Sequence, residues 1–115
     1  MSTRPLTAYD LELACADYVN YRQNIVVPNV YWHFNYELDL LVLTKSGYAW
    51  EIEIKVNKYD LRKDLEKRHE HRHHKISRLY FAITEDLLSE IEHIPERAGI
   101  LVVSLQTGYY RVEKI

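Results

Sequence analysis

Two neighbouring segments with strand-like patterns constrain the fold of this chain more than any other feature. They cover residues 36–44 and 48–56 and are separated by the three residues Lys45-Ser46-Gly47. In the second segment apolar and charged side chains alternate with period 2, which a helix would not produce. The short connection contains a glycine that can adopt a positive φ. The two segments therefore predict a β-hairpin.

The rest of the pattern predicts an α/β domain with helices between strands. Thr7 and Asp10 have the spacing of a capping box, and an apolar helical stripe that includes Cys15 follows them. Pro28 restricts its strand to an edge of the sheet. In chain order we expect a helix over 8–22, an edge strand over 25–27, the hairpin, a helix over 58–75 capped by Asn57, a doubly covered strand over 79–83, a helix over 85–92 capped by Thr84, and strands over 100–105 and 109–112.

Length and composition limit the chain to one domain. Its 115 residues, 47% of them hydrophobic and 28% charged, suffice for a single core over residues 1–115. One cysteine excludes an internal disulfide and suggests a cytoplasmic location. We see neither a signal peptide nor an apolar run of about 20 residues, so we expect no membrane partner. We also expect most of the ten tyrosines at the core or its edge.

The formal net charge of −2 conceals a basic segment. Residues 58–78 hold eight Lys or Arg against four Asp or Glu, a formal charge of +4, together with four of the six histidines. One reading is a solvated helix with interleaved charges, and the other is a surface for phosphates. His69 and His73 are spaced like a zinc pair, but no set of four ligands is evident and a face that gains charge below pH ~6.5 is preferred.

The hairpin brings charged residues onto one face. With a turn of three residues, Asp39 lies opposite Glu53 and Glu37 lies opposite Lys55. Two carboxylates about 5 Å apart destabilise each other unless a cation lies between them. Mg²⁺ commonly takes one or two carboxylates together with a substrate phosphate. The Lys55 ammonium can hold a phosphate oxygen or orient an attacking water.

A simpler reading of the same residues is open. A turn one residue shorter or longer would change the register, and the carboxylates would then face water. The Glu-x-Lys tripeptide is also common by chance. The apolar run over 40–43 favours a site, because it puts the neighbouring acids at a core boundary rather than in open solvent.

Asp39, followed after the turn by Glu53-Ile54-Lys55, resembles the PD-(D/E)xK nuclease superfamily, whose core order αβββαβ matches the expected elements. Within it, the segments EIEIKVNKYDLRKDLEK, SRLYFAI and IPERAGILVV are similar to the MmcB-like DNA repair proteins. The resemblance covers residues 11–103, and Leu38 replaces the proline that often precedes the aspartate. It implies a single-domain restriction-endonuclease-like core with a central mixed β-sheet flanked by helices.

The resemblance also implies roles for individual residues. Asp39, Glu53 and the carbonyl of Ile54 would bind Mg²⁺ or Mn²⁺, Lys55 would assist catalysis, and Glu12 matches an acid on the first helix. The predicted function is metal-dependent hydrolysis of DNA phosphodiester bonds in repair, recombination or restriction. DNA would be held by the basic helix, through Lys58, Arg62, Lys63 and Lys67.

Two other functions remain open. One is a nuclease-fold module that binds DNA or a repair partner without cutting, although the intact set of Asp39, Glu53 and Lys55 disfavours it. The other is a small interaction protein whose acidic remainder contacts another subunit. A nuclease of this size that cuts both strands would have to form a homodimer or act twice.

Overall fold

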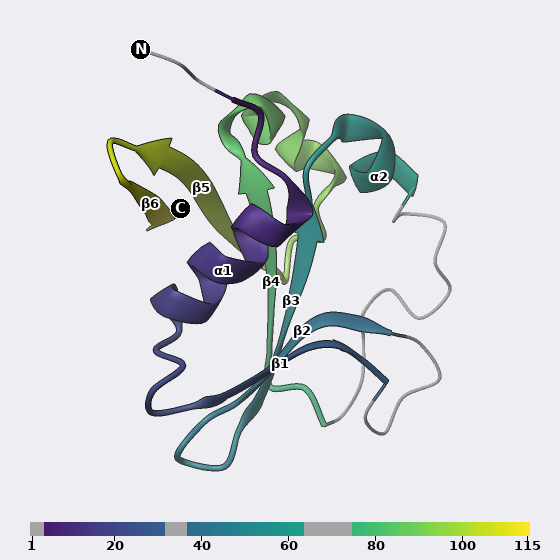
Figure 1. The fold of residues 1–115 in the computed structure, drawn as a ribbon. Coiled ribbons are helices and arrows are strands. Elements are labelled where there is room, and N and C mark those ends of the chain that lie inside the picture. Colours follow the sequence, from purple (N-terminus) through teal and green to yellow (C-terminus); the bar gives the residue numbers. More distant parts are fainter. Residues whose placement is uncertain (1–3, 32–36, 64–74) are drawn as a thin grey trace.

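Within the part of the chain that the structure describes, six strands and three helical segments follow one another in the expected order (Figure 1). The computed structural model describes residues 4–31, 37–63 and 75–115. Its elements are α1 (Ala8–Tyr18), β1 (Ile25–Val30), β2 (Leu38–Leu43), β3 (Ala49–Lys55), α2 (Lys58–Lys63), β4 (Arg78–Thr84), the 3₁₀ helix η2 (Glu85–His93), β5 (Gly99–Gln106) and β6 (Tyr109–Lys114).

The strands form one mixed sheet in the order β1-β2-β3-β4-β5-β6. The pairs β1–β2, β2–β3 and β5–β6 are antiparallel, whereas β3–β4 and β4–β5 are parallel. Parallel neighbours need a crossover connection, and η2 lies in the one between β4 and β5. The β2–β3 register runs from Leu43 opposite Ala49 to Leu40 opposite Ile52, and Gly47 has φ +93°. The predicted turn is therefore confirmed, and the predicted register is confirmed over these four pairs.

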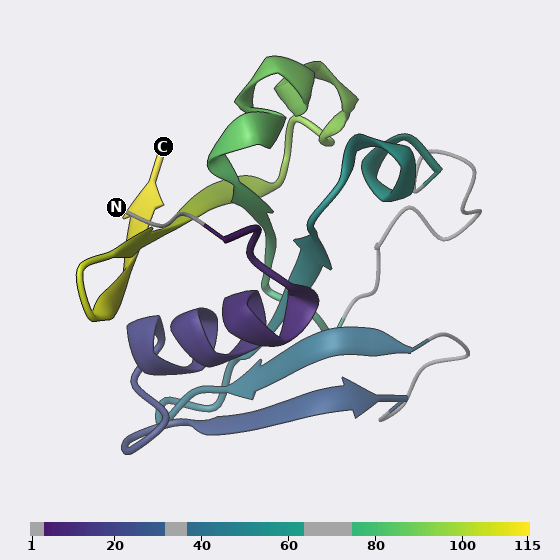
Figure 2. The same ribbon diagram turned by 45° about the horizontal axis from the view of Figure 1, so that its top comes forward.

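Helices cover both faces of the sheet (Figures 1 and 2). Helix α1 packs on one face, over the even-numbered side chains of β2, β3 and β4, and Cys15 lies buried there. Leu61 of α2 and Leu87 of η2 pack on the other face, against the odd-numbered side chains of β4. Burial raises the pKa of the Cys15 thiol to about 12, so it behaves as a small apolar side chain. The expected α/β domain with a mixed sheet flanked by helices is confirmed.

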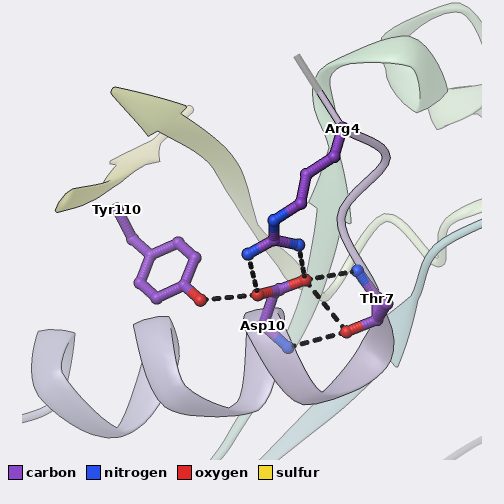
Figure 3. A network of polar contacts seen from close by, with 4 residues as sticks. All are labelled: Arg4, Thr7, Asp10 and Tyr110. Atoms are coloured by element: carbon purple, nitrogen blue, oxygen red, sulfur yellow. Dashed lines mark hydrogen bonds and ion pairs between the residues drawn. The ribbon is translucent and has the colours of Figure 1, made fainter. Parts of the chain in front are cut away.

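The start of α1 is held by a network of polar contacts (Figure 3). Thr7 and Asp10 form the predicted capping box: the Asp10 carboxylate accepts from the Thr7 N–H at 2.7 Å, and the Asp10 N–H donates to the Thr7 hydroxyl at 3.2 Å. Arg4 donates to both carboxylate oxygens at 2.7 and 2.9 Å, and the Tyr110 hydroxyl donates at 2.5 Å. The network joins α1 to β6 at the far end of the sequence.

Three expectations about the helices and tyrosines need correction. Helix α1 ends at Tyr18 rather than near residue 22, because Asn20 adopts φ +62° and stops it. The segment after β4 is a 3₁₀ helix, and the Thr84 hydroxyl hydrogen-bonds the Asp86 side chain instead of capping the backbone. Seven of the nine tyrosines in the described part of the chain are exposed rather than at the core.

The predicted helix over 58–75 begins as expected. Asn57 accepts a hydrogen bond from the Asp60 N–H at 2.8 Å, which is the capping contact anticipated from the sequence. The structure describes this helix over Lys58–Lys63. The remainder of the predicted helix, including the histidines at 69–74, lies outside the described residues.

Candidate functional site

Three charged side chains lie in a row on one face of β3. Because strand side chains alternate, Glu51, Glu53 and Lys55 all face away from α1. Their exposed fractions are 0%, 1% and 6%, which is rare for charged residues. Their register partners on β4 are apolar: Leu79, Phe81 and Ile83. Charged groups that lie in a row among apolar side chains interact strongly with each other, because the local dielectric constant is low.

Asp39 on β2 reaches this row from the neighbouring strand. Its Oδ2 atom accepts a hydrogen bond from the backbone N–H of Ile54 at 2.8 Å, so the carboxylate lies against β3 between Glu53 and Lys55. The β2–β3 pairing runs as far as Leu40 and Ile52, so Asp39 follows directly after the last pair, and its position opposite Glu53 stays a prediction. Asp39 is half-buried, at the core boundary.

The predicted pair between Glu37 and Lys55 is wrong. Glu37 is exposed and precedes β2, whereas Lys55 is buried and its Nζ lies 3.4 Å from Oε1 of Glu53. The β2–β3 pairing ends at Leu40 and Ile52. Beyond that pair, the Ile54 N–H donates its hydrogen bond to the Asp39 carboxylate instead of to a backbone carbonyl of β2. Asp39, Glu53 and Lys55 are thus brought together, and Glu37 is not.

Helix α2 follows β3 directly and carries three of the predicted DNA-binding residues. Lys58, Arg62 and Lys63 line an open hollow of about 340 Å³ together with Tyr59. The Arg62 guanidinium donates to both carboxylate oxygens of Glu90 on η2, at 2.9 and 3.2 Å. The Arg62 guanidinium lowers the pKa of Glu90 by stabilising its charged form. The predicted DNA contact Lys67 lies outside the described residues.

Glu12 lies on the other side of the sheet from the charged row. It is half-buried on α1, which packs over the face that bears Ile52 rather than the face that bears Glu53. Its role in catalysis stays a prediction. Among residues 4–31, 37–63 and 75–115, no group of three or more His, Cys, Asp or Glu side chains is placed to hold a metal ion.

Glu51 is the buried charge that sequence reasoning left without a role. It shares a face with Glu53 and is fully buried between its register partners Leu41 and Leu79. The alternation on β3 placed Glu51 on this face, but a carboxylate on a strand next to a turn is usually solvated. Glu51 is buried because β3 pairs in parallel with β4. The sequence of β3 alone does not reveal that pairing.

Comparison with known protein families shows the family of this chain. The sequence pattern of the family described as DNA repair protein MmcB-like matches residues 7–111. The chain belongs to the MmcB-like family. Its description indicates a role in DNA repair and an interaction with DNA, in line with the resemblance carried by Asp39 and the Glu53-Ile54-Lys55 motif.

A solved structure is similar in fold to this MmcB-like chain. It is a protein of unknown function from Silicibacter pomeroyi, with a TM-score of 0.71 and 17% sequence identity, covering 97% of this chain and 71% of the other. At that identity the likeness shows the fold alone. No curated protein matches the chain. No helix among the described residues is long and apolar enough to cross a membrane.

Proposed function

We propose that this MmcB-like protein is a Mg²⁺- or Mn²⁺-dependent deoxyribonuclease with a PD-(D/E)xK, restriction-endonuclease-like core, acting in DNA repair. The observation that carries the proposal is the meeting of Asp39, Glu53 and Lys55 at the carboxyl end of β3. In sheets with parallel strands, sites commonly lie at the carboxyl ends of those strands. The order of elements α1 to β4 supports the nuclease core.

The chemistry of the donor set fits a hard divalent cation. Asp39, Glu51 and Glu53 contribute three carboxylates to this face and Lys55 one ammonium, so these four side chains carry a formal excess of two negative charges. Mg²⁺ prefers oxygen ligands and takes few protein carboxylates. Asp39, Glu53 and the Ile54 carbonyl would hold the ion. When bound, it would polarise the phosphate and lower the pKa of a water molecule.

The residues of the chain itself would orient the reactants. Lys55 is a compact charge in a site largely shielded from water, where a cation stabilises developing negative charge more strongly than it would in solvent. Its contact with Glu53 fixes the position of the ammonium group. The Asp39 carboxylate is fixed in turn by the Ile54 N–H. Lys58 and Lys63 would hold the DNA backbone beside this site.

The second candidate is a module of the same fold that binds DNA without cutting it. Its binding surface would be the basic hollow on α2, whose cations can contact DNA phosphates without a metal ion. Burial of Glu53 and Lys55 disfavours this second candidate. A buried ion pair contributes little to stability compared with apolar residues of similar size, so stability alone does not account for these charges.

The experiment is a nuclease assay on single-stranded, duplex, nicked, flap and branched DNA, with Mg²⁺, Mn²⁺ or EDTA. We expect cleavage that requires the metal ion. Lys55→Met keeps the volume of the side chain, and we expect it to lower turnover by roughly 100- to 1,000-fold. Lys45→Met is the control, because Lys45 is exposed in the hairpin turn. DNA binding without cleavage under every condition would favour the silent module, and cleavage in EDTA would contradict the proposal.

A further inference from the structure

The hollow on α2 combines positive charge with an exposed aromatic ring. Among the described residues its lining is made by Lys58, Tyr59, Arg62 and Lys63. Surfaces that bind single-stranded nucleic acid have this composition, since cations follow the backbone and rings stack on bases. We propose that Tyr59 is a stacking platform for an unpaired nucleotide, so that the preferred DNA of this site has a single-stranded segment. This inference rests on the proposed function and names its substrate class.

The Tyr59 ring has the surroundings that such a platform needs. The residue is 62% exposed, although a tyrosine in a small domain can bury its ring. The Lys63 ammonium, one helical turn further on, lies over the ring at 5.9 Å from its centroid. A base stacked on Tyr59 would therefore have its phosphate within reach of a flexible cation.

The helix that carries the platform is anchored to the rest of the fold. Leu61 is fully buried in the core on this face, and Arg62 pairs with Glu90 through two hydrogen bonds. The pair offsets the charge of Arg62, so Lys58 and Lys63 supply the positive charge of the hollow. A fixed helix presents Tyr59 in one place, which lowers the entropy lost when a base stacks on it.

The Tyr59 platform lies close to the candidate active site. Lys58 follows Lys55 by three residues, so their Cα atoms are at most about 11 Å apart. Figure 2 shows α2 directly beyond the end of β3. A strand with a phosphate at Lys55 would thus pass α2 within the next few nucleotides. Bases inside a duplex are stacked on each other, so a protein ring can receive only an unpaired or extruded base.

The test measures binding rather than cleavage. Dissociation constants are determined in EDTA for a labelled single strand, a blunt duplex of the same sequence and a duplex with a single-stranded overhang. We expect wild type to prefer the single strand and the overhang. Tyr59→Ala should weaken binding of both by roughly tenfold or more, and change duplex binding less than about twofold. Tyr59→Phe should bind like wild type, because stacking needs the ring and not the hydroxyl.

Tyr109→Ala is the matched control, since Tyr109 is 61% exposed on β6, an edge strand three strands away from β3. Wild-type affinity in Tyr59→Ala, or an equal loss for single strand and duplex, would overturn the inference, and so would a wild type that binds no single strand. A protein that binds single strands through Tyr59 and cuts nothing would keep this inference and overturn the nuclease proposal.

Discussion

The buried pair of Glu53 and Lys55 decides which substitutions can test the site. Both side chains are almost fully buried, and their charged atoms lie 3.4 Å apart. Any substitution that removes one charge of a buried pair costs about 3–5 kcal/mol of stability, whichever side chain replaces it. Alanine would add the cost of a cavity, so we use variants of similar volume, Glu53→Gln and Lys55→Met, and check by circular dichroism that each is folded at the assay temperature.

Asp10 makes a pH-dependent contribution to stability. The hydrogen bonds from Arg4, the Thr7 backbone and Tyr110 hold the pKa of Asp10 well below its usual range. A group whose pKa is depressed in the folded state stabilises the fold above its unfolded pKa of about 3.9, and loses this effect as the pH falls through the folded pKa. We expect Asp10→Asn to lower the free energy of unfolding by about 2 kcal/mol at pH 7, and by less at pH 3.

Urea unfolding of wild type and Asp10→Asn at the two pH values measures this difference. Asp17→Asn is the control, because Asp17 is an exposed carboxylate on the same helix. We expect it to change the free energy of unfolding by less than about 0.5 kcal/mol. If Asp10→Asn lowers the free energy of unfolding by the same amount at pH 7 and pH 3, the Asp10 charge is not the source of the stabilisation.

At the scale of elements, the hairpin could be predicted in detail and the helix ends could not. The alternation on β3 and the position of Gly47 set both the turn and the register, because a shift by one residue would turn Glu53 toward α1. The end of α1 depends on a single residue, Asn20, in the left-handed region. Asparagine adopts that conformation more readily than most residues, but it also occurs within helices, so the sequence alone did not locate the end.

The Asn20 conformation predicts a pair of stability effects. The N–H of Tyr21 donates to the Ala16 carbonyl, and that of Asn20 donates to the Asp17 carbonyl, which is the Schellman pattern. We expect Asn20→Ala to lower the free energy of unfolding by about 1 kcal/mol, because Ala lacks the polar side chain through which asparagine tolerates positive φ. Asn20→Gly should stay within about 0.5 kcal/mol of wild type. Thermal unfolding compares the two, and equal losses would contradict the role of the left-handed conformation.

At the scale of the molecule, the sequence predicted the site on β3 better than its surroundings. The closeness of Asp39 to the Glu53-Ile54-Lys55 segment followed from the hairpin alone, since these residues belong to one local unit. The burial of Glu51 and the Arg62–Glu90 pair depend on β4 and η2, which are distant in sequence. Contacts of that kind have no signature in a local pattern. The exposure of the tyrosines escaped prediction for the same reason.

The arrangement of the sheet explains why these parts meet. Strands β3 and β4 run parallel, so β3 ends beside β4, and α2 and η2 follow those two ends (Figure 1). The charged row therefore ends where α2 begins. The basic and aromatic residues of α2 come next to the carboxylates through chain direction alone. This topology supports the proposal of a cleavage site with an adjoining surface for DNA.

The most direct test of the central claim compares DNA cleavage by wild type and Glu53→Gln in Mg²⁺ or Mn²⁺. The substitution keeps the shape of the side chain and removes its charge. We expect wild type to cleave, and the variant to be slower by at least about 100-fold, with DNA binding in EDTA unchanged and circular dichroism showing a folded variant at the assay temperature. Cleavage by Glu53→Gln at the wild-type rate would contradict the account.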